Sequence, residues 1–171
     1  MTDNALLSGS VSSLRQKLRG RAVSSEELTR ACLERIEAYN GALNAVITIC
    51  SEQAIDSARE ADKAIAKGDI ASLTGIPLLH KDIFCTNGVR TTCGSRMLEQ
   101  FIPAYDATVV SRMQAEGAVM LGKCNMDEFA MGSSNETSFL APSKTPGIST
   151  ACRAAARVVL LRHSLRAWRR W

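Results

Sequence analysis

Apolar residues recur at helical spacing through the first 70 residues of the chain. The spacing predicts an amphipathic helix over residues 11–18 and a longer one that begins after Ser24 and ends near Asn40. Ser24 and Glu27 fit the S-x-x-E capping box, in which a hydroxyl and a carboxylate satisfy amides at a helix start. A third amphipathic helix is expected over residues 54–67, ahead of a glycine.

The pattern then changes to short apolar runs separated by polar and glycine-rich stretches. Residues 43–50, 74–84 and 118–121 are predicted as strands, because they are short, apolar and bounded by turn residues. A helix is expected between the last two, with Asp106 as its N-cap and Gly117 after its end. This alternation predicts an α/β fold in which helices cover a mainly parallel or mixed sheet.

Composition narrows the class of protein without identifying it. The 171 residues are 46% apolar and 22% charged, which suits one globular domain or part of a larger one. No run of about 18 apolar residues occurs, and the first residues lack the basic and apolar segments of a secretory signal. A cytoplasmic location is therefore expected.

Cysteine and histidine usage argues against metal chemistry. The six cysteines form no C-x-x-C pair, so reduced thiols are expected, and His80 and His163 are the only histidines. We expect no metal site, and a catalytic base other than histidine.

Charge divides the chain at about residue 147. The segment 147–171 has six arginines and no acidic residue, whereas residues 1–146 hold the other 15 basic residues and all 17 acidic ones. The alkaline pI therefore comes from the tail alone. Such a break indicates either a separate module or a change in what the sequence encodes.

Lys81 is the most informative candidate for chemistry, because it lies in the predicted strand 74–84. Burial disfavours a charged amine and would make it a usable base, able to take a proton from a serine hydroxyl. The alternative is a structural lysine whose stem lines the core while its head pairs with a carboxylate. Periodicity alone favours the structural alternative.

Other polar residues are weaker candidates. His80 and Asp82 should face away from Lys81 and make structural hydrogen bonds at the strand end. The run 132–137 is typical of a turn, although hydroxyls such as that of Ser133 could contact a small polar substrate. Gly122-Lys123 lacks the glycine-rich frame of a phosphate loop and is discounted as a nucleotide site.

Several segments resemble the amidase-signature enzymes. They are Gly-Ile-Pro-Leu-Leu-His-Lys-Asp-Ile-Phe at 75–84, Thr-Cys-Gly-Ser at 92–95, Tyr-Asp-Ala-Thr-Val-Val at 105–110, and the string from Gly122 to Ser138. Within the family the last string is most similar to the A subunits of bacterial glutamyl-tRNA(Gln)/aspartyl-tRNA(Asn) amidotransferases. The resemblance covers roughly residues 5–146 and implies the N-terminal part of that mixed-sheet fold.

The resemblance also implies a mechanism. The family uses a serine, a cis-peptide serine and a lysine, and Lys81 occupies the lysine position, which overturns the structural alternative. Ammonia from glutamine would pass to a partner B subunit, which uses ATP and magnesium to amidate misacylated tRNA, and a small C subunit completes the heterotrimer. No cofactor is expected in this chain.

The chain departs from the family after Pro146. The expected Gly-Gly-Ser-Ser-Gly-Gly-Ser segment is absent, and Ala156 stands where the cis-serine would lie. Residues 147–161 can be encoded by a set of codons with a second reading. When the same bases are read from one base earlier, they encode Trp-Asp-Leu-Asn-Arg-Val-Pro-Gly-Gly-Ser-Ser-Gly-Gly-Ser-Ala. The tail 147–171 is therefore interpreted as the product of a frameshift.

Three hypotheses follow for the whole chain. The first is the N-terminal portion of an amidotransferase A subunit over residues 1–146, inactive because both serines are missing. The second is a fragment whose basic tail attaches to nucleic acid or an anionic membrane, and the third is a truncated subunit that still contacts its small partner. A helix in the tail carrying Val158, Leu161 and Leu165, and exposed apolar faces on the incomplete domain, are further expectations.

Overall fold

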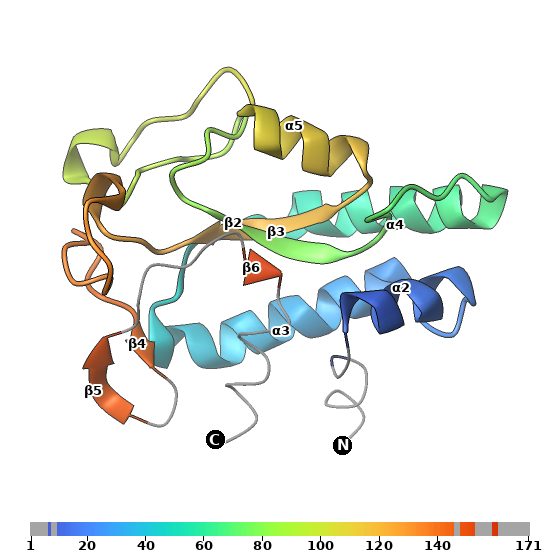
Figure 1. The fold of residues 1–171 in the computed structure, drawn as a ribbon, viewed down its shortest axis with the longest axis horizontal. Coiled ribbons are helices and arrows are strands. Elements are labelled where there is room, and N and C mark those ends of the chain that lie inside the picture. Colours follow the sequence, from blue (N-terminus) through green and yellow to red (C-terminus); the bar gives the residue numbers. More distant parts are fainter. Residues whose placement is uncertain (1–6, 8–9, 146–147, 153–158, 161–171) are drawn as a thin grey trace.

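The computed structural model describes Leu7 and residues 10–145, 148–152 and 159–160, and it shows helices packed around a mixed sheet (Figure 1). Its element labels are those of Figure 1. The helices are α2 (Val11–Arg19), α3 (Ser25–Leu43), α4 (Ser51–Lys67) and α5 (Thr108–Ala115), with 3-10 turns η1 (Arg96–Leu98) and η2 (Glu128–Ala130). The strands are β1 (Val46–Ile49), β2 (Pro77–Lys81), β3 (Val119–Cys124), β4 (Lys144–Thr145), β5 (Ile148–Cys152) and β6 (Val159–Leu160).

The capping box at the start of α3 is confirmed in both directions. The Glu27 amide donates to Ser24 Oγ at 3.0 Å, and the Ser24 amide donates to the Glu27 carboxylate at 2.9 Å. Asp62 of α4 adds a second cap, since its carboxylate accepts from the amides of Ser25 and Glu26. The start of α3 is therefore tied both locally and to the neighbouring helix.

The predicted mixed sheet is confirmed. Its strand order is β1-β3-β2-β6, in which β2 runs parallel to β3 while β1 and β6 are antiparallel to their neighbours. Strands β4 and β5 form a separate antiparallel pair. The parallel pair brings the carboxyl ends of β2 and β3 together, with Lys81 opposite Cys124.

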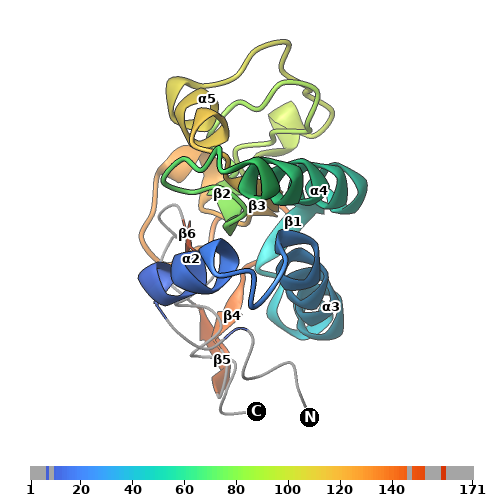
Figure 2. The same cartoon turned by 90° about the vertical axis from the view of Figure 1, so that its right-hand side faces the viewer.

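The apolar core lies between the sheet and helices α2, α3 and α4. Helices α2 and α3 lie on one side of the sheet and α5 on the other, as Figures 1 and 2 both show. Alanines of α4 are fully buried there, so that α4 packs closely against α3 and β3. The core residues are Leu7, Leu18, Val23, Leu28, Cys32, Ile36, Leu43, Val46, Ala54, Ala58, Ile65, Ile76, Leu79, Val119, Leu121 and Cys124.

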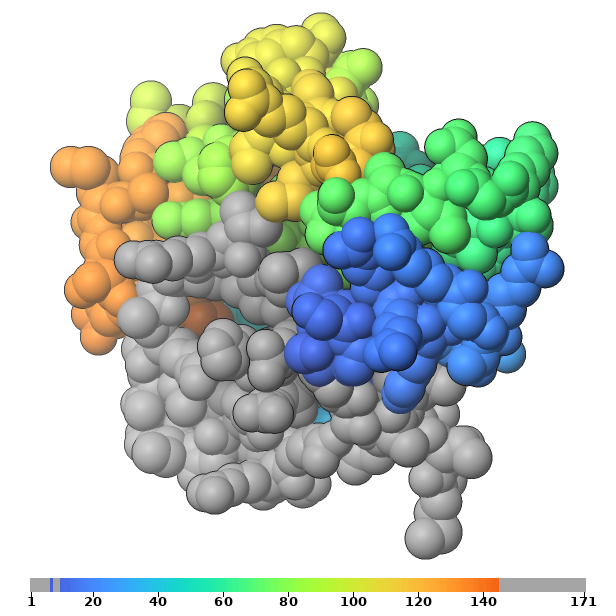
Figure 3. All heavy atoms as spheres, turned by 45° about the vertical axis from the view of Figure 1, so that its right-hand side comes forward, coloured from blue at the N-terminus to red at the C-terminus, as the bar shows by residue number. Residues whose placement is uncertain are grey.

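The connection from α4 to β2 is joined to the end of α5. The Leu73 amide donates to the Glu116 carbonyl at 3.0 Å, and the Gly75 amide to the Gly117 carbonyl at 2.9 Å. In Figure 3 the green segment after α4 and the yellow-to-orange α5 adjoin on one face of the molecule, with blue α2 below. These bonds fix the point at which β2 begins.

Three predicted elements differ from the structure. The strand expected over 74–84 ends at Lys81, so the His-Lys-Asp triplet lies at its end and not in its interior. Asp106 is not an N-cap, because its carboxylate accepts from the Asn87 amide and α5 begins after Ala107. Residues 159–160 form a strand, so the predicted tail helix is wrong there, and its Val158, Leu161 and Leu165 lie outside the described residues.

The large apolar side chains with the highest exposure lie in turns and loops, not on helix or strand faces. Met97 in η1 and Met131 directly after η2 are 85% and 83% exposed. Ile102 and Tyr105, in the loop before α5, are also more than half exposed. The exposed apolar faces of helices and strands that the sequence analysis expects therefore stay a prediction.

We expect opposite effects when alanine replaces two glycines. A Cβ at Gly122 would lie 2.1 Å from the Thr48 carbonyl oxygen, where β1 and β3 meet at a bulge, so Gly122→Ala should lower the free energy of unfolding by about 1–3 kcal/mol. A Cβ at Gly41, inside α3, meets nothing within 4 Å, so Gly41→Ala should raise it by about 0.5–1 kcal/mol. Urea unfolding followed by circular dichroism measures both, and equal shifts would contradict the steric argument.

Candidate active site

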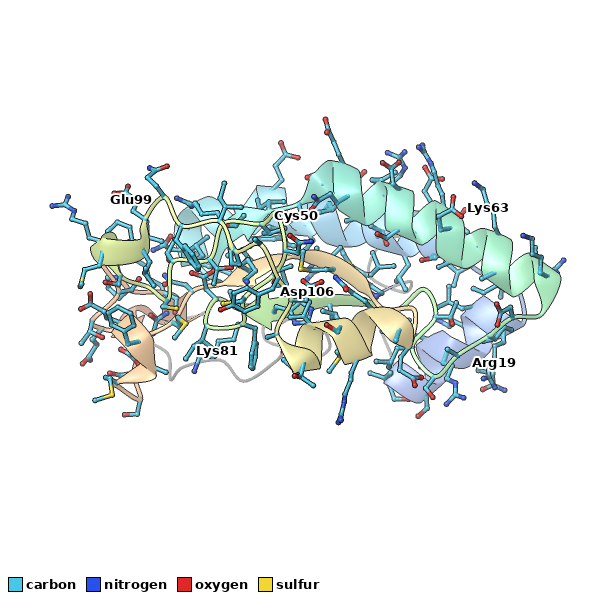
Figure 4. The ribbon with its side chains drawn as sticks, turned by 90° about the horizontal axis from the view of Figure 1, so that it is seen from above. Arg19, Cys50, Lys63, Lys81, Glu99 and Asp106 are labelled. Atoms are coloured by element: carbon cyan, nitrogen blue, oxygen red, sulfur yellow. The ribbon has the colours of Figure 1, made fainter. Side chains whose placement is uncertain are left out.

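Lys81 is the last residue of β2, at the edge where the carboxyl ends of β2 and β3 meet. Its side chain is half-buried, and Figure 4 shows it directed to the outside at the end of the strand. Within the described part of the chain its ammonium group makes no hydrogen bond or ion pair. The strand therefore fixes the position of Lys81, and its amine has no partner among these residues.

His80 and Asp82, on either side of Lys81, are both buried, with exposed fractions of 1% and 0%. Asp82 accepts hydrogen bonds from the Thr92 amide at 2.8 Å and the Thr92 hydroxyl at 2.6 Å, which confirms its predicted structural role. The same role is not confirmed for the His80 ring, since its Nδ1 has no partner among the described residues. Burial, and then the positive charge of Lys123, lower the pKa of His80 to about 4, so the ring is neutral at pH 7.

Lys123 of β3 is a buried cation whose importance the sequence analysis undervalues. It lies beside His80 in the sheet register and is completely buried. Its ammonium group donates to the Phe84 carbonyl, to the Thr86 hydroxyl at 3.1 Å and to the Thr91 hydroxyl at 3.0 Å, and it lies 4.0 Å from an Asp82 carboxylate oxygen. The sequence does hold a signal for this burial. Lys123 follows the apolar run 118–121 and Gly122, and a strand that continues through them buries the lysine.

The hydrogen bonds decide between the two lysines. Burial lowers the pKa of Lys123, which by itself would suit a base. All three donors of its ammonium group are nevertheless committed to groups of the 82–95 loop, so it has no free position for a substrate proton. Lys123 is thus a structural cation, whereas the ammonium group of Lys81 has no hydrogen bond or ion pair among the described residues.

The 82–95 loop folds back over β3 and contacts the next loop along the chain. The Cys93 amide donates to the Asp82 carbonyl, and Ser95 Oγ donates to the Glu128 carboxylate at 2.5 Å. Gly94 has a positive φ of 66°, and a Cβ there would lie 2.6 Å from the Met126 carbonyl oxygen. Only glycine allows this close approach of the two loops.

Asp127 organises the polar run that contains Ser133. Its carboxylate accepts from the amides of Asn135, Glu136 and Thr137. Burial alone would raise the pKa of Asp127, but these hydrogen bonds hold it below its usual value. The loop is therefore a rigid turn around a carboxylate.

Ser133 is exposed on this turn. No contact joins it to Lys81 in the part of the chain that the structure describes. Its role in substrate binding stays a prediction.

The five cysteines whose side chains the structure describes have free thiols. No group of three histidine, cysteine or acidic side chains could hold a metal ion within the described residues. In the same residues no helix is long and apolar enough to cross a membrane. The described residues thus place one half-buried amine, that of Lys81, at a strand end next to glycine-containing loops.

The chain belongs to the amidase family, whose model, described as Amidase, matches residues 27–151. It is 53% identical over 150 residues to the A subunit of the glutamyl-tRNA(Gln) amidotransferase of Geobacter sp. (strain M21), an alignment that covers 84% of this chain and 31% of the relative. It is 62% identical over 123 residues to the corresponding protein of Thioalkalivibrio sulfidiphilus (strain HL-EbGR7), which covers 72% of this chain and 25% of the relative.

Solved structures agree with this assignment. A structure from a vestigial protein complex, described as revealing the evolutionary origins of an s-triazine catabolic enzyme, matches with a TM-score of 0.81 and 29% identity. The match covers 86% of this chain and 33% of that one. The chain thus spans about a third or less of the length of the relatives it matches.

We expect Lys123→Met to destabilise the chain by about 3–5 kcal/mol, because it leaves the buried Asp82 carboxylate without its counter-charge. Burial already raises the pKa of Asp82, and loss of Lys123 raises it further. The folded chain then keeps a proton that the unfolded chain releases, so the free energy of unfolding falls as pH rises above 3.8. Urea unfolding at several pH values measures the slope.

Two control variants accompany this measurement. Lys81→Met removes an equal charge from a half-buried site without partners and should change stability by about 0.5 kcal/mol or less. The double variant Asp82→Asn, Lys123→Met should lose the added pH dependence, because no carboxyl remains at position 82. Equal stability of Lys123→Met and Lys81→Met would contradict the structural role of Lys123.

Proposed function

We propose that residues 1–146 are the N-terminal portion of a glutamyl-tRNA(Gln) amidotransferase A subunit, and that Lys81 is the lysine of its Ser–cis-Ser–Lys catalytic set. The observation that carries the proposal is the unengaged ammonium group of Lys81 at the strand end, within the Gly-Ile-Pro-Leu-Leu-His-Lys-Asp segment. The identity of 53–62% to curated A subunits supports the choice of substrate class.

In the complete enzyme, Lys81 in its neutral form would accept a proton through the cis-serine from the nucleophilic serine. The serine oxygen would attack the carboxamide carbon of glutamine, and the proton would return to the leaving nitrogen as ammonia departs. Water would then hydrolyse the acyl-enzyme to glutamate. Ammonia would pass to the B subunit, where misacylated tRNA is activated with ATP and magnesium, and a small C subunit would complete the assembly.

This chain would not carry out that reaction, because it supplies the lysine without the cis-serine through which the proton passes. Ala156 stands at the position of the cis-serine. A lysine without a hydroxyl to deprotonate has no nucleophile to activate. The chain is proposed to be a catalytically silent part of the amidotransferase.

The purified chain is therefore expected to release no ammonia from glutamine above the rate of its Lys81→Ala variant. A coupled ammonia assay with glutamine measures this, and an active amidotransferase serves as the positive control. Turnover that disappears in Lys81→Ala would show that the chain has a nucleophile of its own and would overturn the proposal.

We propose further that the tail 147–171 arises from a frameshift. Sequencing the DNA across the codon of Gly147 should show an open alternative frame that encodes Gly-Gly-Ser-Ser-Gly-Gly-Ser. The protein made from a gene with the frame restored should release ammonia, and its Lys81→Ala variant should be slower by about two to four orders of magnitude. A locus without that alternative frame would contradict the frameshift.

The acid-free tail with its six arginines favours one competing function, attachment to nucleic acid or an anionic membrane. Salt-sensitive binding of tRNA that is lost when residues 147–171 are removed would support it. Co-purification with the small partner subunit, independent of the tail, would instead support a non-catalytic contact role.

A further inference from the structure

The outer edge of β2 is covered by a strand from the tail. Within the described sheet β2 has β3 on one side and β6 on the other, and β6 is antiparallel with Leu78 opposite Leu160 and Leu79 opposite Val159. Without β6, the backbone N–H and C=O groups on that side of β2 would have no strand partner. A segment of the basic tail therefore completes a sheet that is otherwise built from residues 46–124.

β2 is a strand that needs such cover. Its residues from Pro77 to His80 are all buried, which is the pattern of a strand inside a sheet and not of an edge. A flat apolar edge is a template for pairing with another chain. Pairing along this edge is limited to the residues between Pro77 and Lys81, because proline lacks an amide donor and a lysine at an edge discourages further pairing.

The tail sequence suits a short covering strand. Val158-Val159-Leu160-Leu161 is an apolar run rich in strand-forming residues, and Arg157 and Arg162 stand directly on either side of it. Charged residues at both ends of an apolar run limit how far it can pair. The run thus pairs with the middle of β2, at Leu78 and Leu79.

We propose that the outer edge of β2 is a strand-docking surface and that residues 159–160 of the same chain occupy it as an edge cap that prevents β2 from pairing with a second copy. The tail then has a structural task in this chain, whatever the origin of its codons. The proposal does not rest on the proposed function, since it depends only on the sheet edge and the tail.

Two truncated chains test the cap. One ends at Arg162 and keeps the strand, and the other ends at Arg157 and lacks it. Amide exchange over residues 77–81 should be about tenfold faster in the chain ending at Arg157, as expected for the loss of about one hydrogen bond. Exchange over α3 and α4 should be the same in both chains, which shows that the fold is kept.

Self-association gives the second readout. The chain ending at Arg157 should form a concentration-dependent dimer by sedimentation, whereas the full chain and the chain ending at Arg162 stay monomeric. A peptide Ala-Arg-Val-Val-Leu-Leu-Arg should dissociate that dimer and restore protection over 77–81, and a scrambled peptide of the same composition should not. A full chain that dimerises as readily as the truncated one would overturn the cap.

The unaltered chain provides the measurement that does not depend on folding of a variant. Amides of residues 158–161 and 78–81 should both be protected from exchange in the full chain, as should those of β5, which is paired with β4. Unprotected amides at 158–161, or equal exchange over 77–81 in the two truncated chains, would overturn the proposal.

Discussion

The site depends on the hydrogen bonds and the counter-charge that hold the buried ammonium group of Lys123. A charge with no exposure is costly, because water no longer solvates it, and it persists only when hydrogen bonds and a counter-charge replace that water. Phe84, Thr86 and Thr91 supply the acceptors, and Asp82 the counter-charge. Since all four belong to the segment that follows β2, one cation fixes the path of the chain directly after Lys81.

The alternation of the strand explains why two lysines so close together have different tasks. Leu79 and Cys124 belong to the apolar core, and Lys81 is opposite Cys124 in the register, whereas His80 is beside Lys123. The polar network therefore occupies one face of the strand end and leaves Lys81 outside it. Desolvation alone would have selected Lys123 as the reactive amine, but an amine with three committed donors is a scaffold and not a base.

Local signals made part of this fold predictable. The capping box at Ser24 and the glycine after Lys67 are recognised from a few neighbouring residues, and both bound their helices as expected. Asp106 was expected to cap α5. Its carboxylate instead accepts a hydrogen bond from the Asn87 amide, which is far from it in sequence. The hydrogen-bond partners of Lys123 could not be predicted from the sequence either. They lie more than thirty residues earlier in the chain, and no short-range pattern joins them to Lys123. Lys81 was found by its motif, not by burial, which is only partial.

The distribution of the core explains how a chain that spans about a third of its relatives can hold its site at all. Every residue of the described apolar core lies in the range from Leu7 to Cys124, so the core that helices α2 to α4 form with the sheet is described from that range alone. The sheet edge is different, because backbone groups along β2 need a partner that residues 7–124 do not provide. The described core on the helical side is thus built from side chains near in sequence, whereas the edge of β2 is paired with β6, which lies beyond the residues that the family model matches.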